Sequence, residues 1–209
     1  MRIDWVPFSA SALVAGATAL SVGALLMPAS EDGGASLRIV QEQGGQWMAV
    51  AGLYVFASVA LTVGLPCVLT LFDKRGVRTG LTALAVFTIG CVGIAGFAML
   101  LAFFRALALN ETIDAASVDE VTQDPGLAIF LYGWIGAFYL GELLLGIALM
   151  LAKTTPRWVP FVLIAHVALF PVSGILPESV QPLTALLVTI GLAGVGISAN
   201  NRNSAAVLP

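Results

Sequence analysis

Apolar residues in this chain gather into long blocks, and short polar stretches separate one block from the next. A helix that crosses the hydrocarbon core of a bilayer, about 30 Å thick, needs roughly 20 consecutive apolar residues. Each block reaches or approaches that length. The pattern therefore predicts six transmembrane helices, at residues 7–27, 47–72, 79–104, 127–152, 158–176 and 182–199.

The composition supports the same interpretation. Of the 209 residues, 59% are hydrophobic and 10% are charged, whereas soluble domains average about 45–50% apolar and 25% charged residues. The expected fold class is therefore all-α, with residues 1–209 forming one polytopic membrane bundle. A net charge of −3 excludes the basic surface that binds nucleic acid.

The basic residues predict the orientation. In a six-helix topology, seven of the nine lie on one side of the membrane, and only Arg38 and Arg105 lie on the other. The seven are Arg2, Lys74, Arg75, Arg78, Lys153, Arg157 and Arg202. Because Lys and Arg are enriched in cytoplasmic loops, both termini are expected in the cytoplasm.

Two connections have predicted features of their own. Residues 29–46 are rich in glycine and acidic residues, which indicates a flexible external connection. In residues 105–125, Ser117 and Glu120 have capping-box spacing and predict a short interfacial helix, which Asp124 and Pro125 would end.

Prolines and glycines inside the predicted helices affect their shape and packing. Pro66 and Pro171 each lack a backbone donor and should kink their helices. Small residues let membrane helices approach closely. The glycines expected to serve this purpose are Gly90, Gly93, Gly96, Gly133, Gly136, Gly141, Gly191, Gly194 and Gly196.

Glu142 is the only ionisable acid or base in the apolar run 126–152. Placing a charged side chain at the centre of a membrane helix costs about 2.5–3.5 kcal/mol on insertion scales. Such residues usually face a bundle interior or a cavity, and they mark functional sites. Every functional hypothesis for this chain therefore begins with Glu142.

The single histidine, His166, is predicted to lie near Glu142. Glu142 precedes Lys153 by about 16 Å along a helix, and His166 follows Arg157 by about 13 Å. A short turn joins the two helices, so they are expected to be antiparallel neighbours with both residues at a similar depth. The pair could share a proton, and Tyr139 lies on the same helix face as Glu142.

Further polar side chains are predicted near that depth, and they would describe a binding cavity. Threonines in membrane helices also bond their own backbone, which is the alternative role for them. The candidate ligand-binding residues are Glu142, Tyr139, His166, Thr62, Thr88 and Trp134.

Metal and cofactor sites are not expected. One histidine cannot supply two haem ligands, and Cys67 and Cys91 lie in apolar runs away from it, where they fit small buried side chains. The chain has no phosphate-binding GxxxxGK[ST] and no HExxH.

The layout GALLMP, then WMAVAGLYVFASVALTVGLPCVLTLF, then KRGVRTG and a glycine-rich helix resembles small six-span membrane proteins of GC-rich bacteria, most of them without an assigned function. The resemblance implies the six-span fold and a bacterial inner membrane, and it supplies no site residues.

Three functions fit these features. The first is a bundle that binds or transports a small hydrophobic or amphiphilic molecule, as in the similarly sized vitamin-capturing subunits of bacterial importers, with a membrane protein partner. The second is an enzyme of the lipid or isoprenoid cyclase or isomerase type. It resembles the small membrane-bound terpene cyclases, with Glu142 as general acid and Tyr139 or His166 assisting. Those enzymes use a second acid, for which Asp124 or Glu178 would have to serve. The third is an accessory subunit of a membrane complex.

Overall fold

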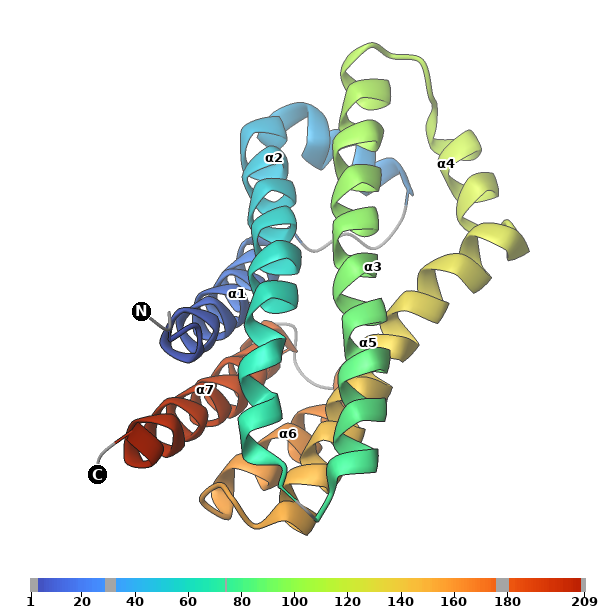
Figure 1. The fold of residues 1–209 in the computed structure, drawn as a ribbon. Coiled ribbons are helices and arrows are strands. Elements are labelled where there is room, and N and C mark those ends of the chain that lie inside the picture. The colour runs from blue at the N-terminus through green and yellow to red at the C-terminus, as the bar shows by residue number, and fades with distance from the viewer. Residues whose placement is uncertain (1–3, 29–32, 74, 176–180, 208–209) are drawn as a thin grey trace.

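The computed structural model describes residues 4–28, 33–73, 75–175 and 181–207, and these residues form helices without any strand (Figure 1). In chain order the elements are α1 (Val6–Leu26), α2 (Gly33–Gly64), η1 (Leu65–Leu71), α3 (Val77–Leu109), α4 (Ala115–Thr122), α5 (Pro125–Ala152), α6 (Trp158–Leu169), η2 (Phe170–Ile175), η3 (Gln181–Thr184) and α7 (Ala185–Val207).

The all-helical prediction is confirmed, and the helices have the character of membrane spans. Within the described ranges, four segments are long and apolar enough to cross a bilayer: α1, the continuous stretch Ala35–Leu71 that α2 and η1 form, α3 and α5. Trp158–Val172 is a shorter apolar helix.

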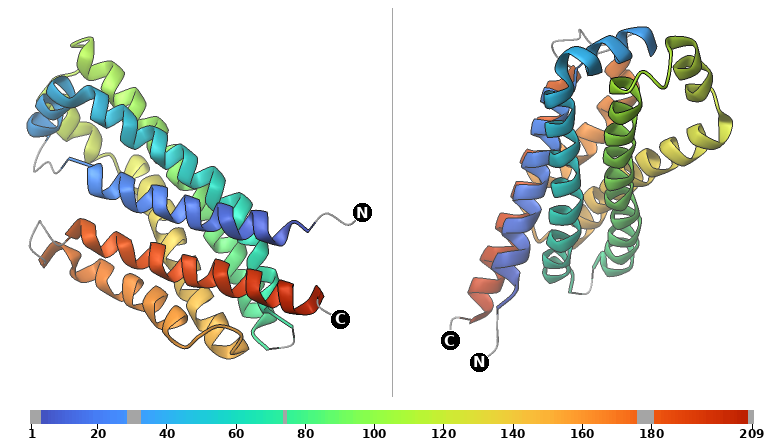
Figure 2. Two further views of the ribbon diagram at one scale, coloured as in Figure 1. Left: turned by 90° about the vertical axis from the view of Figure 1, so that its left-hand side faces the viewer. Right: turned by 90° about the horizontal axis from the view of Figure 1, so that it is seen from above.

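Helices α1, α2, α3, α5, α6 and α7 pack as a closed ring. Going round it, α5 packs on α3, α3 on α2, α2 on α1, α1 on α7, α7 on α6, and α6 on α5 again. The N- and C-terminal ends lie at the same end of this bundle (Figure 2). There the Asn203 amide donates to Asp4 at 2.6 Å, and Arg202 pairs with Asp73. We refer to this end as the terminal end.

Two antiparallel helix pairs pack closely through the same type of contact. In each pair, a glycine of one helix lies against the backbone of a large residue on the other helix, and the reverse also holds. In α1 and α2, Gly16 lies against Leu61 and Gly64 against Leu13. In α3 and α5 the reciprocal pairs are Gly90 with Phe138, and Gly141 with Phe87. A Cβ atom at Gly141 would lie 2.5 Å from the Phe87 Cα atom, so only glycine allows this approach.

η1 fills the middle of the ring in the half nearer the terminal end. Pro66 stands at its start, and because proline lacks an N–H group the α-helix gives way here to a 3₁₀ segment. The buried Ser9 hydroxyl donates to the carbonyls of Val63 and Gly64 and accepts from the Cys67 N–H, which satisfies the interrupted backbone.

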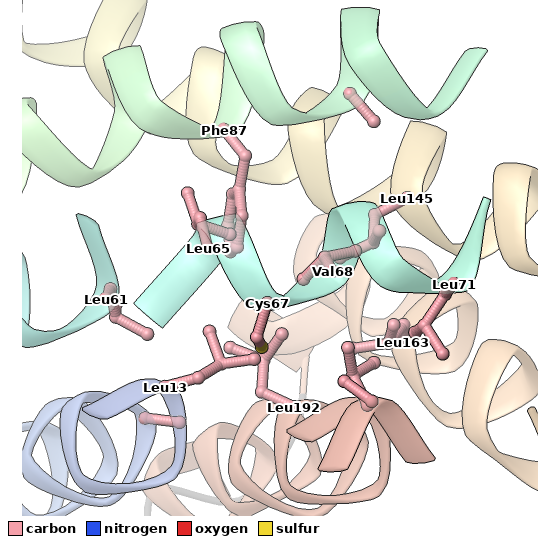
Figure 3. Close-up of a cluster of buried hydrophobic side chains, with 14 of the residues drawn as sticks. Leu13, Leu61, Leu65, Cys67, Val68, Leu71, Phe87, Leu145, Leu163 and Leu192 are labelled. Atoms are coloured by element: carbon pink, nitrogen blue, oxygen red, sulfur yellow. The ribbon is translucent and has the colours of Figure 1, made fainter. Parts of the chain in front are cut away.

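The side chains of η1 form the centre of the main hydrophobic core (Figure 3). Leu65, Cys67, Val68 and Leu71 are all buried there. They meet large side chains from every helix of the ring, including Leu13, Leu61, Phe87, Leu145, Leu163 and Leu192. This half of the ring is therefore solidly packed.

The prediction of a flexible connection at residues 29–46 is wrong from residue 33 onward. α2 begins at Gly33 and bends at Gln43, which has non-helical dihedrals, before it runs down the bundle. Leu37 and Val40 of its first segment are buried against Ala108 and Val118. These few apolar side chains, hidden among glycines and acids, hold the segment in place.

Several predicted boundaries also move outward. α3 continues to Leu109 and α7 to Val207, because hydropathy marks only the apolar part of a helix and polar residues extend it. The predicted helix 158–176 ends as an α-helix at Leu169, and η2 follows with Pro171 in it. Leu176, the predicted last residue, lies outside the described residues.

α4 is the short helix expected between α3 and α5, but its cap differs from the predicted one. Asp114, not Ser117, is the N-cap, and its carboxylate accepts from the Ser117 N–H at 2.8 Å. The hydrogen bonds from Ser117 hold the pKa of Asp114 below its ordinary value. Asp124 similarly caps α5 by accepting from the Leu127 N–H.

Candidate functional site

The structure places Glu142 and His166 in direct contact. Glu142 Oε2 and His166 Nδ1 lie 2.8 Å apart. Glu142 is 0% exposed and His166 is 6% exposed. The second carboxyl oxygen of Glu142, Oε1, is buried without a hydrogen-bond partner among the described residues. Among the described residues, the pair therefore has one hydrogen bond, the one that joins its two members.

The connection between α5 and α6 brings the two residues together. Lys153 adopts a left-handed conformation with φ 56° and ends α5, and α6 starts at Trp158 after a short turn. The helices then run antiparallel, and Gly146 lets them approach, because a Cβ there would lie 2.9 Å from Ile164 Cγ1. Glu142 and His166 face each other across this contact.

Tyr139, one helical turn before Glu142, extends the group with an aromatic surface. Its ring centroid lies 5.3 Å from that of His166 and 4.1 Å from that of Phe170, on which it stacks. Aromatic pairs at such distances stabilise one another beyond their buried area. The imidazole of His166 is thus fixed by a carboxyl on one side and by a ring on another.

A cavity of about 280 Å³ adjoins this group in the half of the ring away from the terminal end. It is lined by residues of α1, α2, α3, α5, α6, η2 and α7. They are Leu20, Ala24, Tyr54, Gly90, Gly93, Ile94, Phe97, Leu131, Trp134, Ile135, Phe138, Tyr139, His166, Phe170, Ala185 and Val188. The lining is apolar and rich in aromatic rings, with polar atoms only on the two tyrosines, the tryptophan and the histidine.

His166, and not Glu142, is the member of the pair that lines the cavity. Its Nδ1 atom is engaged by Glu142, so Nε2 is the ring nitrogen left for a ligand. When the pair holds two protons, Nε2 carries a hydrogen and donates. When it holds one, the shared proton lies between Nδ1 and Oε2, and Nε2 accepts. One proton therefore decides whether Nε2 is a hydrogen-bond donor or an acceptor at the cavity wall.

The other candidate residues divide into two groups. Tyr139 and Trp134 line the cavity with His166. Thr62 and Thr88 do not, and each hydroxyl donates to a carbonyl of its own helix, Ser58 O at 2.8 Å and Leu84 O at 2.8 Å. This is the alternative role noted for threonines in membrane helices.

The sequence pattern did not indicate most of the cavity wall, including Tyr54, Phe97, Phe138 and Phe170. Tyr54 carried the clearest signal, since it is one of only three tyrosines and lies inside an apolar run. The phenylalanines gave none, because in a membrane helix they suit a cavity wall, a helix contact and a lipid-facing surface equally well.

Within the described ranges, no three or more His, Cys, Asp or Glu side chains lie close enough to hold a metal ion. Cys67 and Cys91 are both free thiols and both buried, in η1 and α3. Comparison with protein-family models, with curated proteins and with solved structures finds no match to this chain.

Proposed function

We propose that this protein is a six-span protein of a bacterial inner membrane that binds a small amphiphilic molecule in the cavity beside His166. In this topology α6 with η2, and η3 with α7, complete the set of spans, and both termini lie in the cytoplasm. The terminal end of the bundle supports the topology, because both chain ends and most basic residues gather there. Reporter enzymes that are active on only one side of the membrane, fused to the C-terminus, would test this topology.

One observation carries the binding proposal: a fixed polar atom at the wall of an otherwise apolar cavity. Ligand sites in proteins are concave, mostly apolar, and hold a few placed polar groups that orient the ligand. Here the apolar and aromatic walls suit a hydrocarbon or a flat ring, and His166 Nε2 suits one hydroxyl or carbonyl head group. A free fatty acid fits less well, because its charge would face the Glu142 carboxyl behind the imidazole.

Entry from the bilayer fits the same geometry. α5 slants away from α3 in its first half (Figure 1), and the cavity lies along the inner side of that half at Leu131, Trp134 and Ile135. These three residues are only half-buried. A molecule dissolved in the membrane would reach His166 along this side without crossing a polar surface.

Native mass spectrometry of the detergent-purified protein tests the proposal. His166→Asn keeps an amide nitrogen near the position of Nδ1, so the contact with Glu142 can survive, but it removes Nε2. The wild type should retain a bound molecule that the folded His166→Asn variant has lost. A wild type without any bound molecule, or a variant that retains the same molecule at the same occupancy, would contradict the proposal.

A second candidate function is that of an enzyme acting on a lipid or isoprenoid. It is favoured by the hydrogen that His166 Nε2 carries when the pair holds two protons. An imidazolium held by ionised Glu142 could donate that proton to an oxygen or a double bond of the substrate. His166 would then be the group at the substrate, and Glu142 would position it. Asp124, one proposed second acid, caps α5 away from the cavity lining, and Glu178, the other, lies outside the described residues.

Isotope incorporation separates the two functions. Incubation of the purified protein in D₂O with lipid extracted from its own membrane should add no deuterium to the carbon atoms of a bound, unreacted ligand. An enzyme that protonates carbon would add deuterium to its product, and His166→Asn would abolish the addition. A heavier lipid product formed by the wild type alone would replace the binding proposal with the enzymatic one.

A further inference from the structure

A second recess lies at the terminal end of the bundle, remote from the cavity at His166. It has a volume of about 500 Å³ and lies between the turn that joins α5 to α6 and the last turns of α7. It is lined by Thr154, Pro156, Trp158, Gly194, Ile197, Ser198, Asn201 and Arg202. We refer to it as the terminal groove.

The α7 side of the groove changes from apolar to polar along the helix. Gly194, Ile197, Ser198 and Asn201 follow one another at three- and four-residue spacing, so they share a helix face, and Arg202 adjoins it at the end. Ile197 is 58% exposed, and across the groove Trp158 is 48% exposed. Exposed tryptophans of membrane proteins typically lie at the level of the lipid head groups.

The polar end of the groove offers hydrogen-bond donors that the protein leaves unused. The buried Thr154 hydroxyl has no partner among the described residues. Arg202 pairs with Asp73 through one terminal nitrogen, and its side chain is about one-third exposed. α6 also begins beside the groove, and no side chain caps its first turn.

Acidic groups are few around this end of the groove. Lys153 and Arg157 flank the turn that lines it. Within the described part of the chain, Asp73 pairs with Arg202, and Asp4 accepts a hydrogen bond from the neighbouring Asn203. Basic pockets between membrane helices at the cytoplasmic surface suit phosphate head groups, since each Lys or Arg near the surface contributes about 1 kcal/mol of attraction to anionic lipid.

We propose that the terminal groove binds an anionic phospholipid, with its phosphate beside Arg202, Asn201 and Thr154 and an acyl chain along Ile197 and Trp158. The polar and apolar ends of the groove match the two ends of such a lipid. The proposal rests on the membrane-spanning fold, but it does not depend on the nature of the molecule bound at His166.

Lipid retention in native mass spectrometry tests this site. The full-length protein is exchanged into detergent with equal amounts of phosphatidylglycerol and phosphatidylcholine, and the retained copies of each are counted. Arg202→Gln should lower the selective retention of phosphatidylglycerol about fivefold. Asp73→Asn is the matched control, because it breaks the same ion pair but keeps the cation, and its retention should equal or exceed that of the wild type.

A second variant tests the shape of the groove with its charge unchanged. Ser198→Phe fills the space between α7 and Trp158 and should also lose the selective retention, while thermal unfolding confirms that the protein is folded. Equal loss in Asp73→Asn and Arg202→Gln would overturn the proposal, because the ion pair would then be the important feature. Displacement of the lipid by inorganic phosphate would overturn it too, since the site would then bind the free ion.

Discussion

The two halves of α5 are both apolar, but their surroundings are opposite. In the half nearer the terminal end, Glu142 and Leu145 are 0% exposed, and Leu149 is nearly as deeply buried. In the first half, Ile129 is 75% exposed and Tyr132 is 68% exposed. Both halves are continuous apolar helix. Hydrophobicity alone therefore does not decide which part of a membrane helix packs against protein.

Glycine marks the difference between the halves. At Gly141 the backbone of Phe87 lies so close that a Cβ atom would clash, whereas a Cβ at Gly133 or Gly136 would meet nothing within 4 Å. Glycine thus lies at a close helix contact at position 141, but it has no close neighbour at positions 133 and 136 of the same helix. The cavity begins where the close crossing of α3 and α5 ends, at Phe138 and Gly90.

The largest expected effect concerns the polar pair in the packed half. His166→Leu leaves both Glu142 oxygens buried without partners, and removing one partner of a buried pair costs about 3–5 kcal/mol. The double variant Glu142→Leu/His166→Leu should be more stable than His166→Leu, because neither partner is then orphaned. Chemical unfolding in detergent gives both values. A double variant less stable than His166→Leu would contradict this explanation, because Glu142 would then stabilise the fold without its partner.

A smaller effect distinguishes the glycines. Gly141→Ala should destabilise the protein by about 1–3 kcal/mol, because overpacking forces the two backbones apart. Gly136→Ala should be neutral or stabilise it by about 0.5–1 kcal/mol, since alanine favours the helix and meets no neighbour. The two melting temperatures, measured in the same detergent, make the comparison. Equal destabilisation would remove the distinction between the two halves.

The open half should respond in ligand binding more than in stability. Ala24→Phe extends a ring into the cavity and should lower ligand occupancy about tenfold, or 1.4 kcal/mol. Ala15 lies on the exposed face of the same helix, so Ala15→Phe serves as the control. Native mass spectrometry measures the occupancy. Unchanged occupancy in Ala24→Phe would place the ligand elsewhere.

The smallest effect is a pH dependence at α4, which precedes the open half. Because the pKa of Asp114 is lowered in the folded state, its cap stabilises α4 at pH values above the ordinary carboxyl pKa, near 3.8. That stabilisation is lost as the pH falls through the lowered pKa. The amide resonance of Ser117 should titrate with a midpoint below 3.8, and Asp114→Asn should abolish the transition. A midpoint above 3.8 would contradict the cap.

Sequence patterns were sufficient for the features that depend on local chemistry. Apolar blocks predicted membrane helices, Pro66 and Pro171 marked the two breaks, and a short turn predicted that Glu142 and His166 lie at a similar depth. What the patterns could not supply depends on distant backbones. Nothing local to Gly141 or Gly136 says which one faces another helix, and nothing local to Tyr54 says that it faces a cavity.

The first segment of α2 shows the same limit. Glycines and acids indicated a loop there, yet Leu37 and Val40 are held by side chains of α3 and α4. Depth predicts Thr62 and Thr88 as candidates, but depth does not determine which way a hydroxyl points around the helix. The direction of a side chain follows from packing, which a single sequence records only indirectly.

The reciprocal helix crossings give this architecture a signature that can be searched. At each crossing, both helices carry a large residue that is followed three positions later by a glycine. The four pairs are Leu13 with Gly16, Leu61 with Gly64, Phe87 with Gly90, and Phe138 with Gly141. The glycines meet backbone atoms, which no substitution elsewhere can remove, whereas replacing a large residue by another apolar one changes only side-chain packing. A distant homologue would therefore be recognised by four glycines at these spacings long after the residues around its cavity had diverged to suit another molecule.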